Sequence, residues 1–303
     1  MSELRQSNPQ SAGTNAKAAS QPLARLLALR RPLVMGILNV TPDSFSDGGE
    51  QSMPEVAVAH ALKLHEDGAD ILDIGGESTR PGAKVGFQDA AVDQKEELRR
   101  VLPVIVGIKK AQPEAIVSID TYKAGVAKAA VQSGAEIVND VSGMTWDPEM
   151  AATVAKLTCG VILMHTRGRP DEWASLIAVP DLVTLVRREL RERTERAVMA
   201  GIKRDRIALD PGFGFGKRGE ENYPLLRRLH ELHELRFPIV VGVSRKSFIG
   251  RALANDGNQP ETSDRLFGTL GAEVAAALKG AHIIRTHNVK ASRDALRLAD
   301  IAG

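Results

Sequence analysis

The chain has 303 residues, of which 43% are hydrophobic and 26% charged, and its formal net charge is +2 at pH 7; it is long enough to bury one full core. The near balance of charge argues against a nucleic-acid partner, although the sequence pI of about 8.7 is basic. No apolar stretch approaches the roughly 20 residues of a membrane span. The sequence also has no Cys/His cluster of the kind that predicts a zinc site. The composition agrees with a cytoplasmic enzyme.

Residues 1–31 differ in composition from the rest of the chain. They are rich in Ser, Ala, Gln and Asn, which predicts a mobile tail. Arg25 interrupts the apolar stretch 23–29 and argues against a secretory signal, while an organelle transit peptide remains an alternative. We therefore expect a tail over residues 1–31 and a single folded domain over residues 32–303.

Eight short apolar runs, rich in Val and Ile, alternate with stretches long enough for a helix. Runs of this kind are typical of parallel strands that are buried on both faces. Eight such units in about 270 residues favour a (β/α)8 TIM barrel over an open doubly wound sheet. The predicted strands are residues 33–40, 71–75, 116–121, 137–141, 161–165, 207–210, 239–243 and 283–287.

Three of the joints between a predicted helix and the next strand share a pattern. Gly68, Gly134 and Gly280 are each followed by Ala and then by a strand. A glycine at the end of a helix supplies the positive φ that the chain needs there. We expect these three glycines to end their helices in that conformation.

The predicted strands end on polar residues. In a TIM barrel the active site lies at the carboxyl ends of the strands. Any one of these residues could cap a strand or be a satisfied core residue, and Asn39 could simply precede a Pro-Asp turn; together they predict a shared pocket. They are Asn39, residues 77–80, Asp120, Asn139, Asp140, His165, Asp210, residues 244–246, Arg285 and His287.

The glycine-rich run 211–217 is not a phosphate loop. Pro211 stands in the place of the first required glycine, and Arg218 in that of the Ser or Thr. Glycines that follow a barrel strand instead let the backbone approach a flat ligand. Phe213 or Phe215 could form the wall of such a site.

These motifs resemble those of the dihydropteroate synthase family, from about residue 33 to the end. The resemblance implies a TIM barrel, usually a homodimer, that condenses 6-hydroxymethyl-7,8-dihydropterin diphosphate with 4-aminobenzoate to 7,8-dihydropteroate and diphosphate. It also implies a target of sulfonamides, which mimic aminobenzoate. The segments that carry it are residues 39–49, 75–82, 118–121, 139–140, 209–216, 242–247 and 285–287.

The resemblance also implies roles for individual residues. The chemistry is expected to be an SN1-like substitution in which Asp120, Lys246 and Arg285 are catalytic. Asp210 is expected to grip the amino-pyrimidine edge of the pterin, with a cap before Pro211 as the alternative. The implied pterin-binding set is Asp120, Asn139, Met164, Asp210, Phe215, Gly242 and Lys246.

Two further sets follow from the same resemblance. Diphosphate is expected at Asn39, Arg285 and His287, with Mg²⁺ on Asn39; Arg285 and His287 are two apart on one strand and so share a face. Aminobenzoate needs no strong general base, because its amine is neutral near pH 7. Its implied contacts are Thr41, Pro42, Phe45, Thr79, Arg80, Pro81 and Ser244.

Two alternative functions share features of this chain. A corrinoid methyltransferase has the barrel and the Asp/Asn pocket but needs no diphosphate clamp, and the segment 39–49, Thr79, Arg80, Arg285 and His287 argue against it. A silent pterin-binding protein would be expected to lack a loop or the clamp, and both are present here.

Residues 263–280 predict an apolar helix that serves either a dimer contact through the C-terminal helices or packing against the barrel. Thr166 and Asn288 differ from the residues that are commonest at these positions in the family. Asn288 removes a charge near the diphosphate end, which affects the affinity for Mg²⁺ or phosphate.

Overall fold

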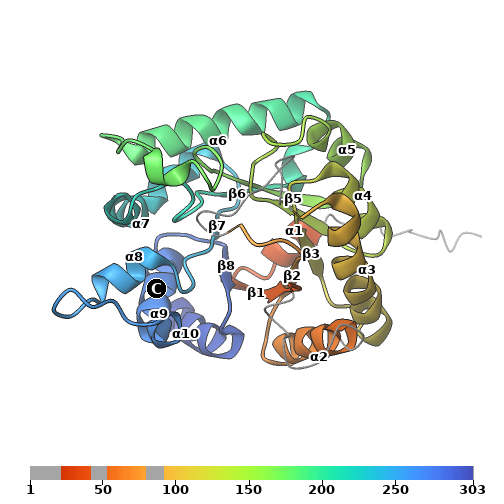
Figure 1. Ribbon diagram of the computed structural model, residues 1–303, viewed down its shortest axis with the longest axis horizontal. Helices are drawn as coiled ribbons and strands as arrows, with labels where there is room; N and C mark the ends of the chain where they lie inside the picture. The colour runs from red at the N-terminus through yellow and green to blue at the C-terminus, as the bar shows by residue number, and fades with distance from the viewer. Residues whose placement is uncertain (1–21, 42–52, 80–91, 303) are drawn as a thin grey trace, which may run out of the picture.

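The computed structural model describes residues 22–41, 53–79 and 92–302. Eight parallel strands form one sheet in the order β6-β5-β4-β3-β2-β1-β8-β7, and a parallel bridge between Leu209 and Ile239 joins its two edges. The strands therefore close into a barrel with the helices around it (Figure 1). The predicted TIM barrel is confirmed.

The eight strands agree with the predicted runs to within a few residues at each end. They are β1 (Leu33–Asn39), β2 (Ile71–Gly75), β3 (Val117–Asp120), β4 (Ile137–Asp140), β5 (Gly160–Met164), β6 (Ile207–Asp210), β7 (Val240–Val241) and β8 (Ile283–Thr286).

An α-helix lies between every two successive strands, and α8 adds an extra one between β7 and β8. The α-helices are α1 (Pro22–Leu27), α2 (Met53–Glu66), α3 (Gln94–Ala111), α4 (Ala124–Gln132), α5 (Met150–Lys156), α6 (Leu182–Met199), α7 (Asn222–Arg227), α8 (Ser247–Ala252), α9 (Leu266–Leu278) and α10 (Val289–Ala302). Short 3-10 turns cover Trp173–Ser175, Arg204–Arg206, Gly219–Glu221, Leu229–Leu235 and Thr262–Arg265.

The glycines at the helix-to-strand joints behave as predicted. Gly68, Gly134 and Gly280 have φ values of +104°, +113° and +88°. At the first joint the N–H of Gly68 donates to His65 O at 3.0 Å, and the N–H of Ala69 donates to Leu64 O at 3.0 Å. This pair of bonds satisfies the last carbonyls of the helix and turns the chain directly into the next strand.

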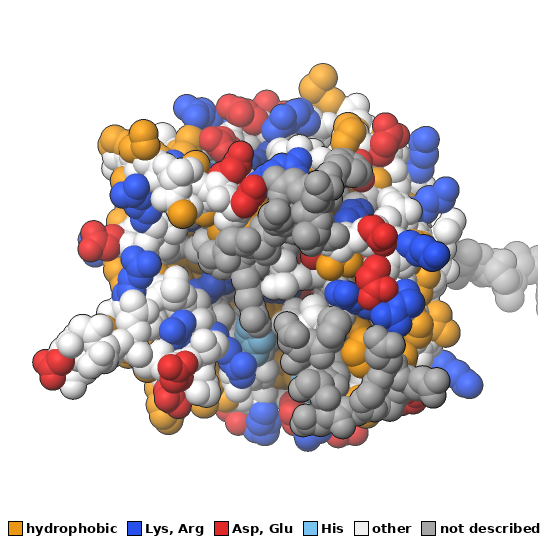
Figure 2. All heavy atoms as spheres, in the orientation of Figure 1, with side chains coloured by type: hydrophobic (Ala, Val, Ile, Leu, Met, Phe, Trp, Pro, Cys, Tyr) orange, Lys and Arg blue, Asp and Glu red, His pale blue; other side chains and the backbone are white. Residues whose placement is uncertain are grey.

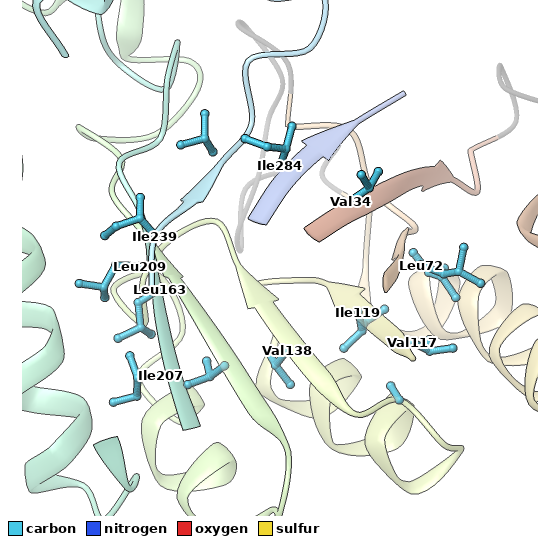
Figure 3. Close-up of a cluster of buried hydrophobic side chains, with 14 of the residues drawn as sticks. Val34, Leu72, Val117, Ile119, Val138, Leu163, Ile207, Leu209, Ile239 and Ile284 are labelled. Carbon is cyan, nitrogen blue, oxygen red and sulfur yellow. The ribbon is translucent and has the colours of Figure 1, made fainter. Parts of the chain in front are cut away.

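Residues alternate along each strand between the inside and the outside of the barrel. Outward side chains such as Val34, Leu72, Val138 and Ile284 pack in the core between the sheet and the helices (Figure 3). Inward side chains near the start of the strands form a second apolar cluster. Because the period is two, the next inward residue on each strand lies nearer the carboxyl end of the barrel.

The expectation of a mobile tail over residues 1–31 is wrong for residues 22–31. Helix α1 buries Leu23 and Leu26 in the inner apolar cluster, at the end of the barrel where the strands begin. Arg31 then binds Asp70 through two nitrogens, at 3.0 and 2.7 Å. Tertiary contacts therefore order this segment; residues 1–21 lie outside the described part of the chain.

The surface of the molecule mixes charges of both signs. Lys and Arg side chains alternate with Asp and Glu side chains over the face that Figure 2 shows. Among the helices that the structure describes, none combines the length and the apolar character needed to cross a membrane.

Candidate active site

A cavity opens inside the barrel at the carboxyl ends of the strands. Most of its lining comes from residues that the sequence assigned to the pterin, while Val141 and Gly212 had been given no role. The lining residues are Asn139, Val141, Met164, Asp210, Gly212, Phe215, Gly242, Lys246 and Arg285. The strand ends therefore do meet at one pocket, as the barrel predicted.

Asp210 ends β6 and is almost fully buried. Its Oδ1 accepts a hydrogen bond from the N–H of Gly212 at 2.7 Å. Its Oδ2 lies 3.9 Å from the position that a Cβ on Gly242 would occupy, so this oxygen faces the pocket. Burial raises the pKa of Asp210 to about 6. The carboxylate thus caps the following turn and still offers one oxygen to a ligand.

Lys246 lies across the same pocket. Its Nζ stands 3.9 Å from the centroid of the Phe215 ring, which is a cation–π distance. Burial, together with the nearby charge of Arg285, lowers the pKa of Lys246 to about 8. The ring and the ammonium together offer a flat apolar surface beside a hydrogen-bond donor.

The backbone around Phe215 is held by a second lysine that the sequence had not singled out. The buried Lys217 donates to the carbonyl oxygens of Gly212, His165 and Phe215 at 2.7, 3.2 and 3.2 Å. Gly212 has a φ of +66°, and a Cβ there would stand 1.9 Å from the carbonyl oxygen of His165. Lys217 and this glycine therefore fix the loop that forms one wall of the pocket.

His165 does not line the pocket. Its side chain is fully buried, and its Nε2 lies 3.1 Å from Oε2 of Glu189 on α6, outside the barrel. Its place on the strand explains this, because the preceding residue, Met164, points inward. The alternative of a core histidine is thus the one that the structure favours.

Arg285, on β8, is held by two carboxylates. Its Nε donates to Asp73 Oδ2 at 2.6 Å, and its Nη2 donates to Asp120 Oδ2 at 2.6 Å. Burial opposes the charged form of Arg285, but the two carboxylates raise its pKa above its ordinary value. Burial also raises the pKa of Asp120, to about 7, against the effect of Arg285.

Asp73 is the residue that the sequence interpretation missed. It is fully buried in β2, and its Oδ2 also accepts from Asn139 Nδ2 at 3.1 Å. A signal for it exists in the sequence, since it is an acid inside the apolar run 71–75. A buried acid in such a run needs partners, and here they are site residues.

Asn39 and Asp120 both lie close to Gly75. A Cβ on Gly75 would lie 3.8 Å from Asp120 Oδ2 and 3.9 Å from Asn39 Oδ1. The amide oxygen and the carboxylate therefore border the same small region of the barrel. In the described part of the chain, no three His, Cys, Asp or Glu side chains are grouped as a metal site, but oxygen donors of this kind fit a hard cation that keeps most of its waters.

Ser244 and His287 are hydrogen-bonded to each other. The Ser244 Oγ lies 3.0 Å from His287 Nδ1 and accepts from the His287 N–H at 3.2 Å. The group expected to bind aminobenzoate therefore adjoins the group expected to bind diphosphate. Thr41 and Thr79 are half-buried at the carboxyl ends of β1 and β2. The remaining predicted residues, Pro42, Phe45, Arg80 and Pro81, lie outside the described part of the chain.

Comparisons with known proteins agree with this geometry. Residues 35–287 match the family described as pterin binding enzyme. Dihydropteroate synthases from Synechocystis and from Escherichia coli are each 44% identical to the chain, the first over 89% of this chain and 90% of its own length, the second over 90% and 93%. A solved structure of Xanthomonas albilineans dihydropteroate synthase with 4-aminobenzoic acid is 46% identical, with a TM-score of 0.82, and covers 90% of this chain and 94% of that one. A Yersinia pestis dihydropteroate synthase in complex with a sulfonamide is 41% identical over 90% of this chain and 95% of that one, also with a TM-score of 0.82.

Proposed function

The chain belongs to the pterin-binding enzyme family, as a relative of the dihydropteroate synthases, and from this premise we propose which of its residues carry each part of the reaction. The protein is a transferase of folate biosynthesis. It condenses 6-hydroxymethyl-7,8-dihydropterin diphosphate with 4-aminobenzoate to give 7,8-dihydropteroate and diphosphate, and it is a sulfonamide target. The observation that carries the assignment is one cavity lined by Asn139, Asp210 and Lys246 with Arg285 beside them.

The pterin ring binds in that cavity. Its edge has N–H donors and a carbonyl acceptor, which call for a carboxylate, an amide and an ammonium. Asp210 accepts from the amino-pyrimidine edge through its free oxygen, and Asn139 and Lys246 complete the recognition. Met164 and Phe215 form the apolar walls, and Gly242 leaves room for the ring because any larger side chain would enter the cavity.

Diphosphate binds at the rim, to Arg285, His287 and Asn39. Arg285 supplies a charged fork of donors that suits phosphate oxygens. We assign Mg²⁺ to Asn39, with Asp120 beside it; when bound, the ion supplies positive charge to the diphosphate oxygens. The support for this is the pair of oxygen donors that lie close to Gly75.

The substitution is dissociative. The bond between the exocyclic carbon and the diphosphate oxygen breaks first, and the resulting cation is delocalised into the electron-rich dihydropterin ring. The carboxylate of Asp120 favours that cation electrostatically. The neutral amine of 4-aminobenzoate then forms the new C–N bond and loses a proton to water. Ser244, Thr41 and Thr79 surround the incoming aminobenzoate, together with Pro42, Phe45, Arg80 and Pro81.

Steady-state kinetics test these roles one by one. We expect Asp210→Ala to raise KM for the pterin substrate, Arg285→Ala to lower kcat, and Asn39→Ala to raise the Mg²⁺ concentration at half-maximal rate.

Chelation by EDTA should abolish turnover, and added Mg²⁺ should restore it. Asp205→Ala is the matched control, since Asp205 is an exposed acid just before the other end of β6. A normal Mg²⁺ dependence in Asn39→Ala would overturn the metal assignment.

We also place the protein in the cytoplasm as a homodimer formed through the C-terminal helices. The buried free thiol of Cys159 suits a reducing compartment. Phe267 and Leu278 on α9 are 83% and 59% exposed, and Leu298 and Ile301 on α10 are 68% and 76% exposed; large apolar side chains gathered on two neighbouring helices suit a covered surface.

Light scattering at micromolar concentration tests the dimer. We expect the wild type to have twice the mass of the chain and Phe267→Asp to shift towards the monomer, because a charge cannot be buried in an apolar contact. Met199→Asp is the matched control, since Met199 is 87% exposed on another helix. A monomeric wild type would rule out the dimer.

A further inference from the structure

Asp73 connects two groups that serve different parts of the substrate. One carboxylate oxygen, Oδ2, accepts from Arg285 Nε at 2.6 Å and from Asn139 Nδ2 at 3.1 Å. The roles assigned above give Arg285 to the diphosphate and Asn139 to the pterin, and they give none to Asp73. The residue that touches both is thus the one whose contribution is unexplained.

Arg285 uses different nitrogens for its two carboxylates. Nε is bonded to Asp73, whereas Nη2 is bonded to Asp120. The guanidinium can therefore give up one carboxylate and keep the other. If the guanidinium swings about its Nε–H···Oδ2 hydrogen bond with Asp73, Nη2 moves and that hydrogen bond stays in place.

The two carboxylates lie at different depths in the barrel. Asp120 is level with Gly75 in the strand register, whereas Asp73 is level with Ser118, two residues deeper. The side chain of Asp120 is 16% exposed and that of Asp73 is 0% exposed. An anion that enters from the carboxyl end therefore reaches the Asp120 side of Arg285 first.

The second oxygen of Asp73 has no hydrogen-bond partner in the described part of the chain, although it is buried. Glu273 Oε1 on α9, away from the pocket, is unpaired in the same way. The role of Asp73 therefore follows from the contacts of its Oδ2 with Arg285 and Asn139 and not from its second oxygen.

We propose that Asp73 is a positioning residue that holds Arg285 by Nε while Nη2 passes from Asp120 to the diphosphate. Diphosphate binding then frees Asp120 from its hydrogen bond with the guanidinium of Arg285 at the step where the adjacent exocyclic carbon becomes positive. The exchange involves hydrogen bonds alone and moves no proton. It rests on the proposed assignment of Arg285 to the diphosphate.

Asp73→Asn tests the proposal, because it keeps the shape of the side chain and removes its charge. We expect the affinity for inorganic diphosphate with Mg²⁺ to weaken about tenfold and kcat to fall by a similar factor, while 6-hydroxymethylpterin, which lacks the diphosphate, binds within about threefold of the wild type. Ser118→Ala is the matched control, since Ser118 is a buried polar residue level with Asp73 in the register of the next strand. Equal losses for both ligands, or no loss for diphosphate, would overturn the proposal.

A structure of the wild type with bound diphosphate gives a second test that needs no variant. The expected result is Nε still on Asp73 and Nη2 on a phosphate oxygen. Arg285 still bonded to Asp120, or released from Asp73, would contradict the exchange. If Arg285→Ala keeps its diphosphate affinity, the proposed function itself is wrong at this residue; if it loses that affinity while Asp73→Asn does not, only the present inference fails.

Discussion

The two ends of the barrel interior have opposite chemistry. At the end where the strands begin, inward side chains such as Ile137, Ala208 and Ile283 form an apolar cluster that α1 closes with Leu23. Two residues further along the same strands stand Asn139, Asp210 and Arg285, about 7 Å away. Each of these strands therefore contributes one inward residue to the fold and the next one to the reaction.

This difference indicates that stability and activity have separate sources within one barrel. Burial moves the pKa of Asp210 up to about 6 and that of Lys246 down to about 8, so each charged form is disfavoured in the folded protein. The residues of the inner apolar cluster at the other end carry no titratable side chain. Substitutions at the two ends should consequently have opposite consequences.

The largest expected effect is that of Lys246→Met, at the carboxyl end. We expect kcat/KM to fall about 10²- to 10³-fold, because a donor that contacts the pterin is lost. The melting temperature should rise rather than fall. Since burial lowers the pKa of Lys246 from its ordinary 10.5 to about 8, the charged lysine destabilises the fold fully below pH 8 and no longer does so above 10.5.

Thermal melts and initial rates from pH 7 to 10.5 measure both effects. The gain in melting temperature should be greatest below pH 8 and shrink as the pH rises. Lys203→Met serves as the control, since Lys203 is exposed near the start of β6. If Lys246→Met melts below the wild type at pH 7, the claim that the charged lysine destabilises the fold is wrong.

At the opposite end, Leu23→Ala should act on stability alone. Leu23 is 1% exposed in the inner apolar cluster, and truncation of a buried leucine costs about 3 kcal/mol in the free energy of unfolding. Denaturant titration measures this loss, and kcat/KM per folded molecule should be unchanged. Leu29→Ala is the control, because Leu29 is 51% exposed. Loss of activity in folded Leu23→Ala would mean that the two ends are coupled.

The smallest effect concerns the pH dependence of pterin binding. With the Asp210 pKa raised by burial to about 6, the affinity of the wild type for 6-hydroxymethylpterin should fall about tenfold for each unit of pH below 6. Asp210→Asn should bind more weakly and show no such slope. Because burial raises the pKa of Asp210, protonation of this carboxyl stabilises the folded protein. Its contribution to the free energy of unfolding is fully present below pH 3.8 and is lost as the pH rises through 6.

Titration calorimetry between pH 5 and 8 measures that slope, with Asp205→Asn as the control at the exposed end of the strand. If Asp210→Asn keeps the wild-type slope, a group other than Asp210 is responsible for the pH dependence.

Much of the barrel was predictable because it depends on local patterns. The Val- and Ile-rich runs, the strand-end polar residues and the glycines at the helix ends are each visible in the sequence. Parity along a strand then indicates which residues share the interior, as for Arg285 and His287. The positions of Asn139, Asp210 and Lys246 after predicted strands indicated one shared pocket, and their assignment to the pterin came from the family resemblance.

What the sequence did not reveal depends on contacts between distant segments. Helix α1 has only six residues, too few to be stable alone, so its order comes from packing against strands far along the chain. The sequence around Asp73 indicates only a core strand. Its role in the site becomes visible from its hydrogen bond with Arg285, which is 212 residues away. The pairing of Arg285 with Asp120 is equally invisible to any local rule.

The most direct measurement is the condensation itself, followed with purified wild type, both substrates and Mg²⁺. We predict that diphosphate and dihydropteroate form in a 1:1 ratio, and that a sulfonamide competes with 4-aminobenzoate. Binding of the pterin substrate without formation of dihydropteroate would leave the fold and pocket intact but contradict the account of the carboxyl end as a catalytic site.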